Sequence, residues 1–142
     1  MREESVFGKI DQEVEEVNKL TFVKNEPMYW EFIRQTRNRY KEMFIEQEYI
    51  TSLAQKKYME KYNDNYYVCL ATEFQIPVGW VGEIDGDVRI CVIKEWRQFG
   101  VGKYLLDNLY EIHGDKLHAK ILAENISSVK LFSKTKIPYN II

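Results

Sequence analysis

Residues 88–112 constrain this chain most, because they predict a strand, a glycine loop and a helix in direct succession. Residues 88–92 are mostly apolar and β-branched, as in a buried strand. Arg97-x-x-Gly100-x-Gly102 follows, where the predicted helix begins. The first N–H groups of a helix are unsatisfied and partly positive, so this junction is suited to binding an anion such as phosphate. The helix is predicted by apolar residues at helical spacing: Val101, Leu105, Leu106, Leu109 and Ile112.

The spacing within the loop argues against two common phosphate-binding motifs. A Walker loop needs a glycine five residues before its Gly-Lys pair and a Ser or Thr after it, but this chain has Arg97 and Tyr104 there. A dinucleotide fingerprint needs a third glycine, where this chain has Leu105. The alternative interpretation is an ordinary tight turn, in which the glycines have no role in binding.

The bulk composition is that of one globular domain covering residues 1–142, with 45% hydrophobic and 14% aromatic residues. The formal net charge of −2 gives no basic footprint, so we expect no nucleic-acid partner. The apolar runs are too short to span a membrane, and the charged start Met1–Ser5 lacks a secretory signal, so we expect a cytoplasmic protein. With two histidines and no Cys-x-x-Cys spacing, we expect no metal site, and we expect Cys69 and Cys91 to be small buried residues.

The order of predicted elements is a strand, two helices, three antiparallel strands, then helix, strand, helix and strand. Asp85-Gly86 is a hairpin-turn signal between the second and third of the three strands. Asn25, and either Thr51 or Ser52, can cap the first two helices. Ile10, Val14 and Val17 predict a further short helix within an N-terminal extension, residues 1–19. We expect strands at 20–24, 66–71, 78–84, 87–92, 117–122 and 137–142, and helices near 27–44, 52–62, 101–113 and 126–132.

Two motifs resemble signatures of the GCN5-related N-acetyltransferase (GNAT) superfamily. The acyl-CoA loop of that family, Val-x-Pro-x-x-(Arg/Gln)-x-x-Gly-x-(Gly/Ala), is matched by Val92, Arg97, Gly100 and Gly102, with Lys94 in place of proline. The second signature, Asn-x-x-(Ser/Ala)-x-x-Leu-(Tyr/Phe)-x-Lys, is matched by Asn125, Ser128, Leu131, Phe132 and Lys134. The order of elements also matches from about Leu20 onward. The resemblance implies an α/β (α+β) fold, with a central mixed, mostly antiparallel sheet flanked by helices and splayed at the acyl-CoA site.

The resemblance also implies acetyl-CoA as cosubstrate, no metal, and direct attack of an amine on the thioester. Cys91, Val92 and Ile93 would then face the pantetheine chain. Asn125 and Ser128 would lie near the pantetheine or its phosphates. The pyrophosphate would rest on the glycine loop, whose residues are Arg97, Gln98, Phe99, Gly100, Val101, Gly102 and Lys103.

The proton-transfer groups are less well indicated than the cosubstrate site. Glu83 and Asp87 are the carboxylates nearest the expected cleft, although either could be a solvated charge at a strand end. Many relatives have a tyrosine acid at the position of Phe132, which has no proton to donate. Tyr139 or solvent would then serve as the acid. The chain also offers one C-terminal strand where the family has two, so a neighbouring subunit's strand in a homodimer could complete the sheet.

The function that follows from the resemblance is acetyl transfer to a primary amine, with a small molecule such as an amino sugar as one acceptor. That acceptor rests on a weak similarity in two stretches, whose arginines could equally mark a solvated helix face. The residues are Trp30, Ile33, Arg34, Arg37 and Asn38, followed by Gln47, Ile50 and Thr51. A protein N-acetyltransferase is the alternative within the enzyme class. Phe132 motivates a second class, a catalytically weak acyl-CoA-binding or regulatory module.

Overall fold

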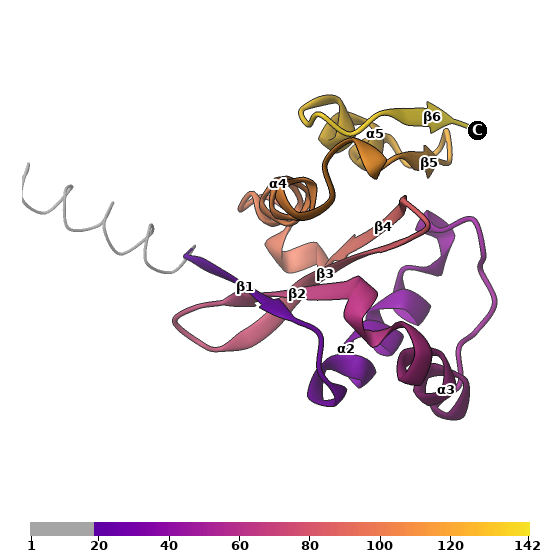
Figure 1. The fold of residues 1–142 in the computed structure, drawn as a ribbon, viewed down its shortest axis with the longest axis vertical. Helices are drawn as coiled ribbons and strands as arrows, with labels where there is room; N and C mark the ends of the chain where they lie inside the picture. The colour runs from indigo at the N-terminus through magenta and orange to yellow at the C-terminus, as the bar shows by residue number, and fades with distance from the viewer. Residues whose placement is uncertain (1–18) are drawn as a thin grey trace, which may run out of the picture.

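The computed structural model describes residues 19–142 as a four-stranded antiparallel sheet, with helices on both faces and a second small sheet beside it (Figure 1). The predicted helix around Val14 lies outside the described residues, while the predicted element order of the rest is confirmed. The elements are β1 (Leu20–Lys24), α2 (Pro27–Arg39), α3 (Ser52–Tyr62), β2 (Tyr66–Ala71), β3 (Ile76–Ile84), β4 (Asp87–Val92), α4 (Val101–His113), β5 (Ala119–Ile121), α5 (Ile126–Ser133) and β6 (Tyr139–Ile141).

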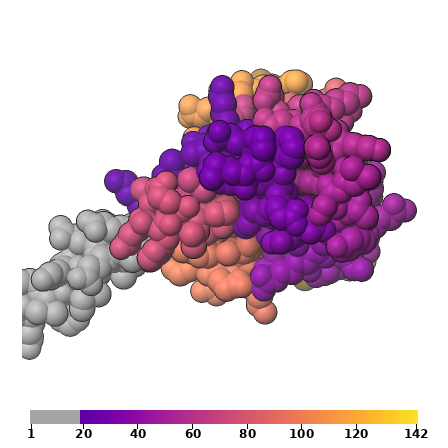
Figure 2. Space-filling model, turned by 90° about the horizontal axis from the view of Figure 1, so that it is seen from below, coloured from indigo at the N-terminus to yellow at the C-terminus, as the bar shows by residue number. Residues whose placement is uncertain are grey.

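The main sheet has the strand order β1-β2-β3-β4, and each face is covered by different helices. Helix α4 packs against one face through Val101, Leu105, Leu106 and Leu109, all of which are fully buried. Ile112, which the sequence places on the same apolar stripe, is half exposed. Helices α2 and α3 belong to a second apolar core on the other face, and their side chains cover most of the view in Figure 2, in indigo to purple.

The turn between β3 and β4 is the two-residue turn that Asp85-Gly86 predicts. Asp85 and Gly86 have φ angles of 52° and 87°, which the right-handed twist of a tight hairpin requires. Under the turn, the Gly86 N–H donates to Glu83 Oε2 at 2.8 Å. Glu83 Oε1 lies 3.7 Å from His113 Nε2 and 3.9 Å from Lys116 Nζ. Glu83 therefore joins the hairpin to the C-terminal end of α4.

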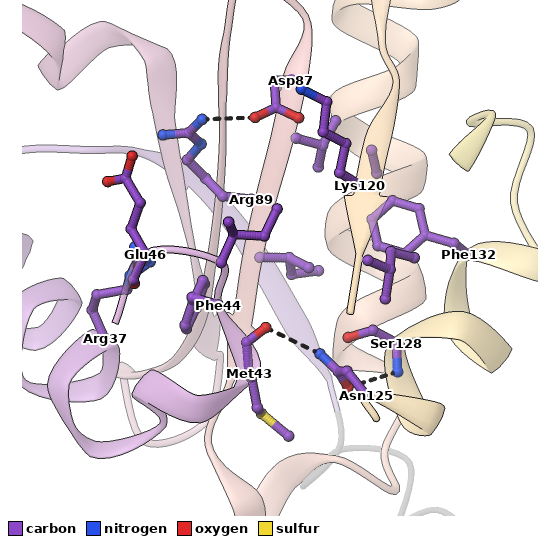
Figure 3. A pocket seen from close by; sticks show the side chains of 15 residues that line it. Arg37, Met43, Phe44, Glu46, Asp87, Arg89, Lys120, Asn125, Ser128 and Phe132 are labelled. Carbon is purple, nitrogen blue, oxygen red and sulfur yellow. Dashed lines mark hydrogen bonds and ion pairs between the residues drawn. The ribbon is translucent and has the colours of Figure 1, made fainter. Parts of the chain in front are cut away.

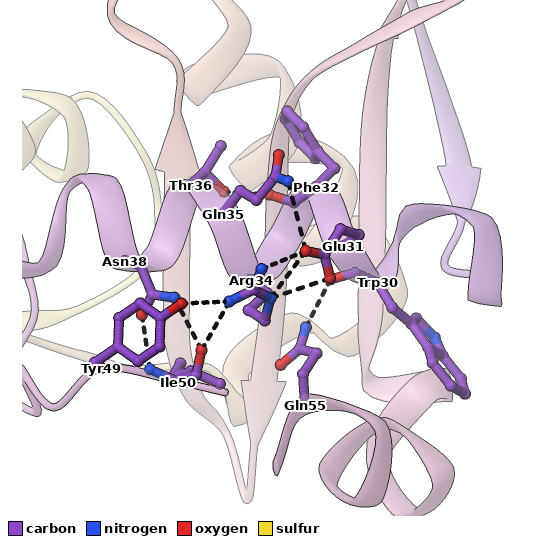
Figure 4. A network of polar contacts seen from close by, with 10 residues as sticks. All are labelled: Trp30, Glu31, Phe32, Arg34, Gln35, Thr36, Asn38, Tyr49, Ile50 and Gln55. Atoms are coloured by element: carbon purple, nitrogen blue, oxygen red, sulfur yellow. Dashed lines mark hydrogen bonds and ion pairs between the residues drawn. The ribbon is translucent and has the colours of Figure 1, made fainter. Parts of the chain in front are cut away.

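The loop between α2 and α3 is held against α2 by a polar network (Figure 4). Arg34 Nη1 donates to Tyr49 Oη and to the Ile50 carbonyl, both at 3.1 Å, and its guanidinium pairs with Glu31. Asn38 exchanges two hydrogen bonds with the Ile50 backbone, of 2.9 and 2.8 Å. These contacts fix the loop, residues 40–51, in one position beside the sheet.

The helix caps follow the sequence at α3 but not at α2. Thr51 Oγ1 accepts a hydrogen bond from Ala54 N at 3.1 Å, so Thr51 is the cap of α3. The prediction that Asn25 caps α2 is wrong: Glu26 is the N-cap, and the buried Asn25 side chain donates to Met59 Sδ at 3.4 Å.

Cys69 and Cys91 are both free and buried, as the sequence predicts. No helix within residues 19–142 combines the length and the apolar character that a membrane crossing needs. The same residues contain no group of three or more His, Cys, Asp or Glu side chains that could hold a metal ion.

Replacing Glu83 with alanine is expected to lower the free energy of unfolding by about 1–3 kcal/mol, because it removes the buried acceptor of the Gly86 N–H. Urea denaturation measures the change. Glu73→Ala, an exposed glutamate in the turn after β2, is the matched control and should change stability by less than about 0.5 kcal/mol. An equal loss in both variants would contradict this role of Glu83.

Candidate functional site

Strands β4 and β5 meet at one end and then separate. Asp87 and His118 form a single parallel bridge, in which Val88 N donates to His118 O and His118 N donates to Gly86 O, both at 2.9 Å. From Ala119 onward, β5 pairs in parallel with β6. The splay that the sequence predicts is therefore the gap between β4 and β5 (Figure 1).

The inner edge of β4 presents backbone groups to this gap. Backbone N–H groups along a strand point to alternate sides, so those of Ile90 and Val92 point the same way as that of Val88, away from β3. The Val92 carbonyl on this edge accepts a hydrogen bond from Arg97 Nε at 3.0 Å. The N–H groups of Ile90 and Val92 are thus placed to pair with an extended amide-containing ligand.

Next to this edge lies a cavity of about 430 Å³, here called the glycine-loop cavity. Tyr104 N donates to Gly100 O at 3.0 Å, which is the first hydrogen bond of α4. The amides of Val101, Gly102 and Lys103 therefore have no acceptor within the helix. The cavity is lined by Met43, Ile90, Cys91, Val92, Arg97, Gln98, Gly100, Gly102, Lys103, Asn125, Ser127, Ser128, Leu131 and Lys134.

The glycine-loop cavity has the charge and the shape that an anion requires. Arg97, Lys103 and Lys134 bring positive charge to its lining from three different places in the chain. Lys103 also pairs with Asp107 at 2.5 Å, but both side chains are half exposed, so this contact adds little stability. A Cβ atom on Gly102 would lie 2.7 Å from Leu131 Cδ2, so the glycine lets α5 approach the start of α4.

Lys94, where the family motif has proline, makes a contact that proline could not make. Its backbone N–H donates to Tyr40 Oη at 2.9 Å, and proline has no N–H. The Arg97 guanidinium lies over the same Tyr40 ring, 4.6 Å from its centroid. Tyr40 therefore ties the glycine loop to the end of α2.

A second cavity, of about 280 Å³, lies beside the β4–β5 bridge and is here called the bridge cavity (Figure 3). Four residues border both cavities, namely Met43, Ile90, Asn125 and Ser128, so the two form adjoining parts of one cleft. The remaining residues that line the bridge cavity are Arg37, Phe44, Ile45, Glu46, Asp87, Val88, Arg89, Ala119, Lys120, Ile121 and Phe132.

Asn125 connects the two walls of the cleft (Figure 3). Its Oδ1 accepts from Ser128 N at 3.2 Å and so caps α5. Its Nδ2 donates to the Met43 carbonyl in the loop after α2 at 3.3 Å. One side chain thus sets both the start of α5 and its distance from the opposite wall.

The proton-transfer residues predicted from sequence lie in different surroundings. Asp87 borders the bridge cavity, and its Oδ2 accepts from Arg89 Nη2 at 3.1 Å. Glu83 borders neither cavity and is enclosed under the hairpin turn. Tyr139 also borders neither; its ring packs against Phe132, with centroids 6.2 Å apart, and Phe132 itself lines the bridge cavity.

Most residues predicted to bind acetyl-CoA do line the glycine-loop cavity, with three exceptions. Ile93 donates its N–H to Val78 O at 3.0 Å, on the β3 side. Val101 is buried in the core, and Phe99 is partly exposed outside the lining. The residues brought together are Cys91, Val92, Arg97, Gln98, Gly100, Gly102, Lys103, Asn125 and Ser128.

The structure adds lining residues to which the sequence analysis assigned no role. Lys134 belongs to the second motif, so its position was a usable signal. The helix predicted near 27–44 is too long at its C-terminal end: α2 ends at Arg39, so Met43 and Phe44 lie with Ile45 and Glu46 in the segment between α2 and α3, to which the sequence analysis assigned no role in the site. The three arginines of α2 also differ from one another: Arg34 anchors the loop, Arg37 lines the bridge cavity, and the exposed Arg39 pairs with Glu95.

Comparison with known proteins gives a likeness of structure alone. No protein-family model and no curated protein sequence matches the chain. A GNAT-family acetyltransferase from Streptococcus pneumoniae is 21% identical, with a TM-score of 0.63 over 82% of this chain and 83% of that one. The protein yncA from Salmonella typhimurium, solved with acetyl-CoA, is 15% identical, with a TM-score of 0.66 over 80% and 76%. A spermidine N-acetyltransferase SpeG mutant from Vibrio cholerae is 20% identical, with a TM-score of 0.63 over 81% and 77%.

These likenesses confirm the fold class that the sequence predicts, an α/β arrangement shared with acetyltransferases. More specifically, the chain shares the fold of the GNAT-family acetyltransferase and of yncA, and at 21% and 15% identity the likeness is one of fold alone.

Asn125→Ala is expected to lower the free energy of unfolding by about 0.5–2 kcal/mol, because α5 loses its cap. Asn125→Asp keeps an acceptor for Ser128 N but loses the amide donor to Met43, so it should retain most of the capping contribution. Urea denaturation of the three proteins measures the difference. If the alanine variant is as stable as the natural protein, Asn125 does not cap α5 in solution.

Proposed function

We propose that this protein is an N-acetyltransferase that transfers the acetyl group of acetyl-CoA to the primary amine of a small molecule. The observation that carries the proposal is the open edge of β4 beside the free amides that begin α4, within one cleft. The acetyl-CoA complex of yncA, which shares the fold, supports the choice of cosubstrate.

The residues of the glycine-loop cavity fit acetyl-CoA. We assign the pyrophosphate to the amides of residues 101–103, with Arg97 and Lys134 as counter-charges. The N–H groups of Ile90 and Val92 would pair with the pantetheine amides or the thioester carbonyl. When bound, acetyl-CoA supplies an acetyl group that is activated as a thioester. Its acyl end would lie where the two cavities meet, beside Asn125 and Ser128.

Asp87 is our proposed proton acceptor, because it is the one of the two predicted carboxylates that borders the bridge cavity. It would take a proton from the acceptor ammonium, directly or through water, and so free the amine for attack. Glu46, from the loop after α2, is a second carboxylate on the same cavity. We assign Glu83 to the hairpin turn rather than to proton transfer.

The group that assists the leaving sulfur must also be sought in the lining. No tyrosine borders either cavity among the described residues, and Phe132 has no proton to donate. Ser128 borders both cavities, so we assign its hydroxyl the hydrogen bond to the departing sulfur, with the proton supplied through solvent. Tyr139, which the sequence suggests as the acid, packs against the Phe132 ring and does not border either cavity, so we do not assign it the protonation of the sulfur.

Cys91 borders the glycine-loop cavity, but its environment disfavours an acyl-cysteine intermediate. Burial raises the pKa of the Cys91 thiol to about 12. The thiolate is the nucleophilic form, so the side chain stays unreactive at neutral pH. This favours direct attack by the acceptor amine, as the family resemblance implies.

The size and charge of the bridge cavity bear on the acceptor. A cavity of about 280 Å³ suits a small molecule better than a protein segment. A spermidine N-acetyltransferase shares this fold, but polyamines carry only positive charges, whereas this lining contains Arg37, Arg89 and Lys120. In the segment that resembles amino-sugar enzymes, Arg34 and Asn38 hold the loop instead, and only Arg37 reaches the cavity.

The second candidate function is a catalytically weak acyl-CoA-binding module, favoured by the absence of a tyrosine from the described cleft lining. A homodimer in which a neighbour's strand adds to β6 also stays a prediction. Within the described residues β6 pairs only with β5, and sedimentation velocity would test the addition.

Gly100→Glu is expected to weaken CoA binding at least tenfold, because a carboxylate would stand beside the amides that receive the pyrophosphate. Gly100 has a φ of 76°, so any side chain there adds backbone strain. Gly100→Ala carries the same strain without the charge and is the matched control. Isothermal titration with CoA measures both, and equal affinities in the two variants would remove the loop from the pyrophosphate site.

Asp87→Asn is expected to lower kcat by about 10²–10⁴-fold if Asp87 accepts the amine proton, with little change in CoA affinity. CoA release with a panel of amines measures kcat, and Glu46→Gln serves as the comparison carboxylate. Tight CoA binding by the natural protein without turnover of any amine would favour the binding module. Full activity of Asp87→Asn would exclude Asp87 as the base.

A further inference from the structure

We infer that the acceptor carries an acidic group, a carboxylate or a phosphate, in addition to its amine, and that Arg37 and Arg89 bind that group. This rests on the proposed function, since it names the substrate class of the bridge cavity. The two arginines come from different elements, α2 and β4, and both line that cavity (Figure 3).

Arg89 has unused hydrogen-bonding capacity in a buried place. Its Nη2 donates to Asp87 Oδ2 at 3.1 Å. Its Nε is buried and makes no hydrogen bond with the described residues. A buried donor without a partner is unfavourable. The Arg89 side chain as a whole is 30% exposed and lines the cavity, so an acidic oxygen of a bound ligand can meet its accessible part. The fork of the guanidinium also suits two-oxygen groups, which carboxylate and phosphate both are.

Arg37 is held in place by contacts that leave most of its donors available. Its guanidinium carbon lies 3.9 Å from the centroid of the Phe44 ring, and Nη2 donates to the Glu46 carbonyl at 3.0 Å. The Arg37 guanidinium has five N–H groups, and this is the one hydrogen bond that they make to the described residues. Burial lowers the pKa of Arg37, and the charge of Arg89 acts in the same direction. A ligand anion beside the two arginines would offset both effects.

The charges around the cavity fit a molecule with both signs. Its cations are Arg37, Arg89 and Lys120, and its carboxylates are Asp87 and Glu46. Asp87 is paired with Arg89, whereas Glu46 makes no ion pair with the described residues. An acceptor ammonium can therefore lie near the carboxylates while its acidic group meets the arginines. An amine without an acidic group would leave Arg37 without an ion-pair partner among the described residues, and a polyamine would be repelled by the two arginines.

The test compares amines that differ only in the acidic group. Glucosamine 6-phosphate is set against glucosamine for the phosphate form, and β-alanine against propylamine for the carboxylate form. Steady-state CoA release is measured for each. We expect a KM at least tenfold lower for the acidic member of one pair, and the pair that shows it identifies the group.

Arg37→Gln and Arg89→Gln are expected to raise the KM for the acidic amine by about 10–100-fold and to change it less than threefold for its neutral partner. CoA affinity, measured separately, should stay unchanged. Arg39→Gln is the matched control, because Arg39 lies on the same helix but is exposed and pairs with Glu95. Arg89→Lys, which keeps the charge but loses the fork, should fall between the natural protein and Arg89→Gln; it also serves if Arg89→Gln does not fold.

A binding measurement separates this inference from the proposed function. CoA-loaded protein is titrated with the same four amines, so that affinity is obtained without turnover. Arginine-dependent binding of an acidic amine without acetylation would overturn the transferase and keep the inference. Acetylation of neutral and acidic amines with equal KM would overturn the inference and keep the transferase. The inference also fails if no acidic amine shows arginine-dependent binding.

Discussion

The arrangement of the cleft depends on the single bridge between β4 and β5. At that bridge the two strands are held by two backbone hydrogen bonds, and beyond it β5 is committed to β6. Beyond the bridge, the inner edge of β4 therefore carries unpaired backbone groups next to the core. Such groups are unfavourable unless water or a ligand pairs with them, so the separation of two strands creates the binding edge. On the far side of the gap, Asn125 sets the position of α5.

Much of the fold could be predicted from the sequence because its signals are local. The Asp85-Gly86 turn and the apolar stripe of α4 are set by backbone geometry and helical period, and both appear as expected. The misses have tertiary causes. Asn25 was a plausible cap by residue type, but α3 places Met59 beside it and Glu26 takes the cap position. Ile112 shares the helical period of α4 but is half exposed, so the period alone did not show which residues of the stripe the fold covers.

The two cavities differ in how far the sequence could indicate them. The glycine loop is a continuous stretch of sequence, and its amides do not depend on distant side chains. The sequence motif was therefore enough to indicate where this cavity would form. The bridge cavity combines Arg37 and Glu46 with Arg89 and Lys120, residues that only the folded chain brings together. Glu83 and Asp87 show that the sequence could not indicate the surroundings of a side chain even for two residues close together in the chain. Both flank one turn, yet Glu83 is enclosed beside α4 whereas Asp87 borders the cavity.

The hydrogen bonds from Arg34 and Asn38 to Ile50 have a consequence for how tightly a small ligand can be held. They anchor the loop of residues 40–51 at a point that contributes nothing to the cavity lining, so that wall exists before any ligand arrives. Association then loses little chain entropy, and more of each contact is retained as affinity. Substitutions at residues 43–46 can also change which ligand is selected without loosening the loop, because the residues that line the cavity differ from Arg34, Asn38 and Ile50, which anchor the loop.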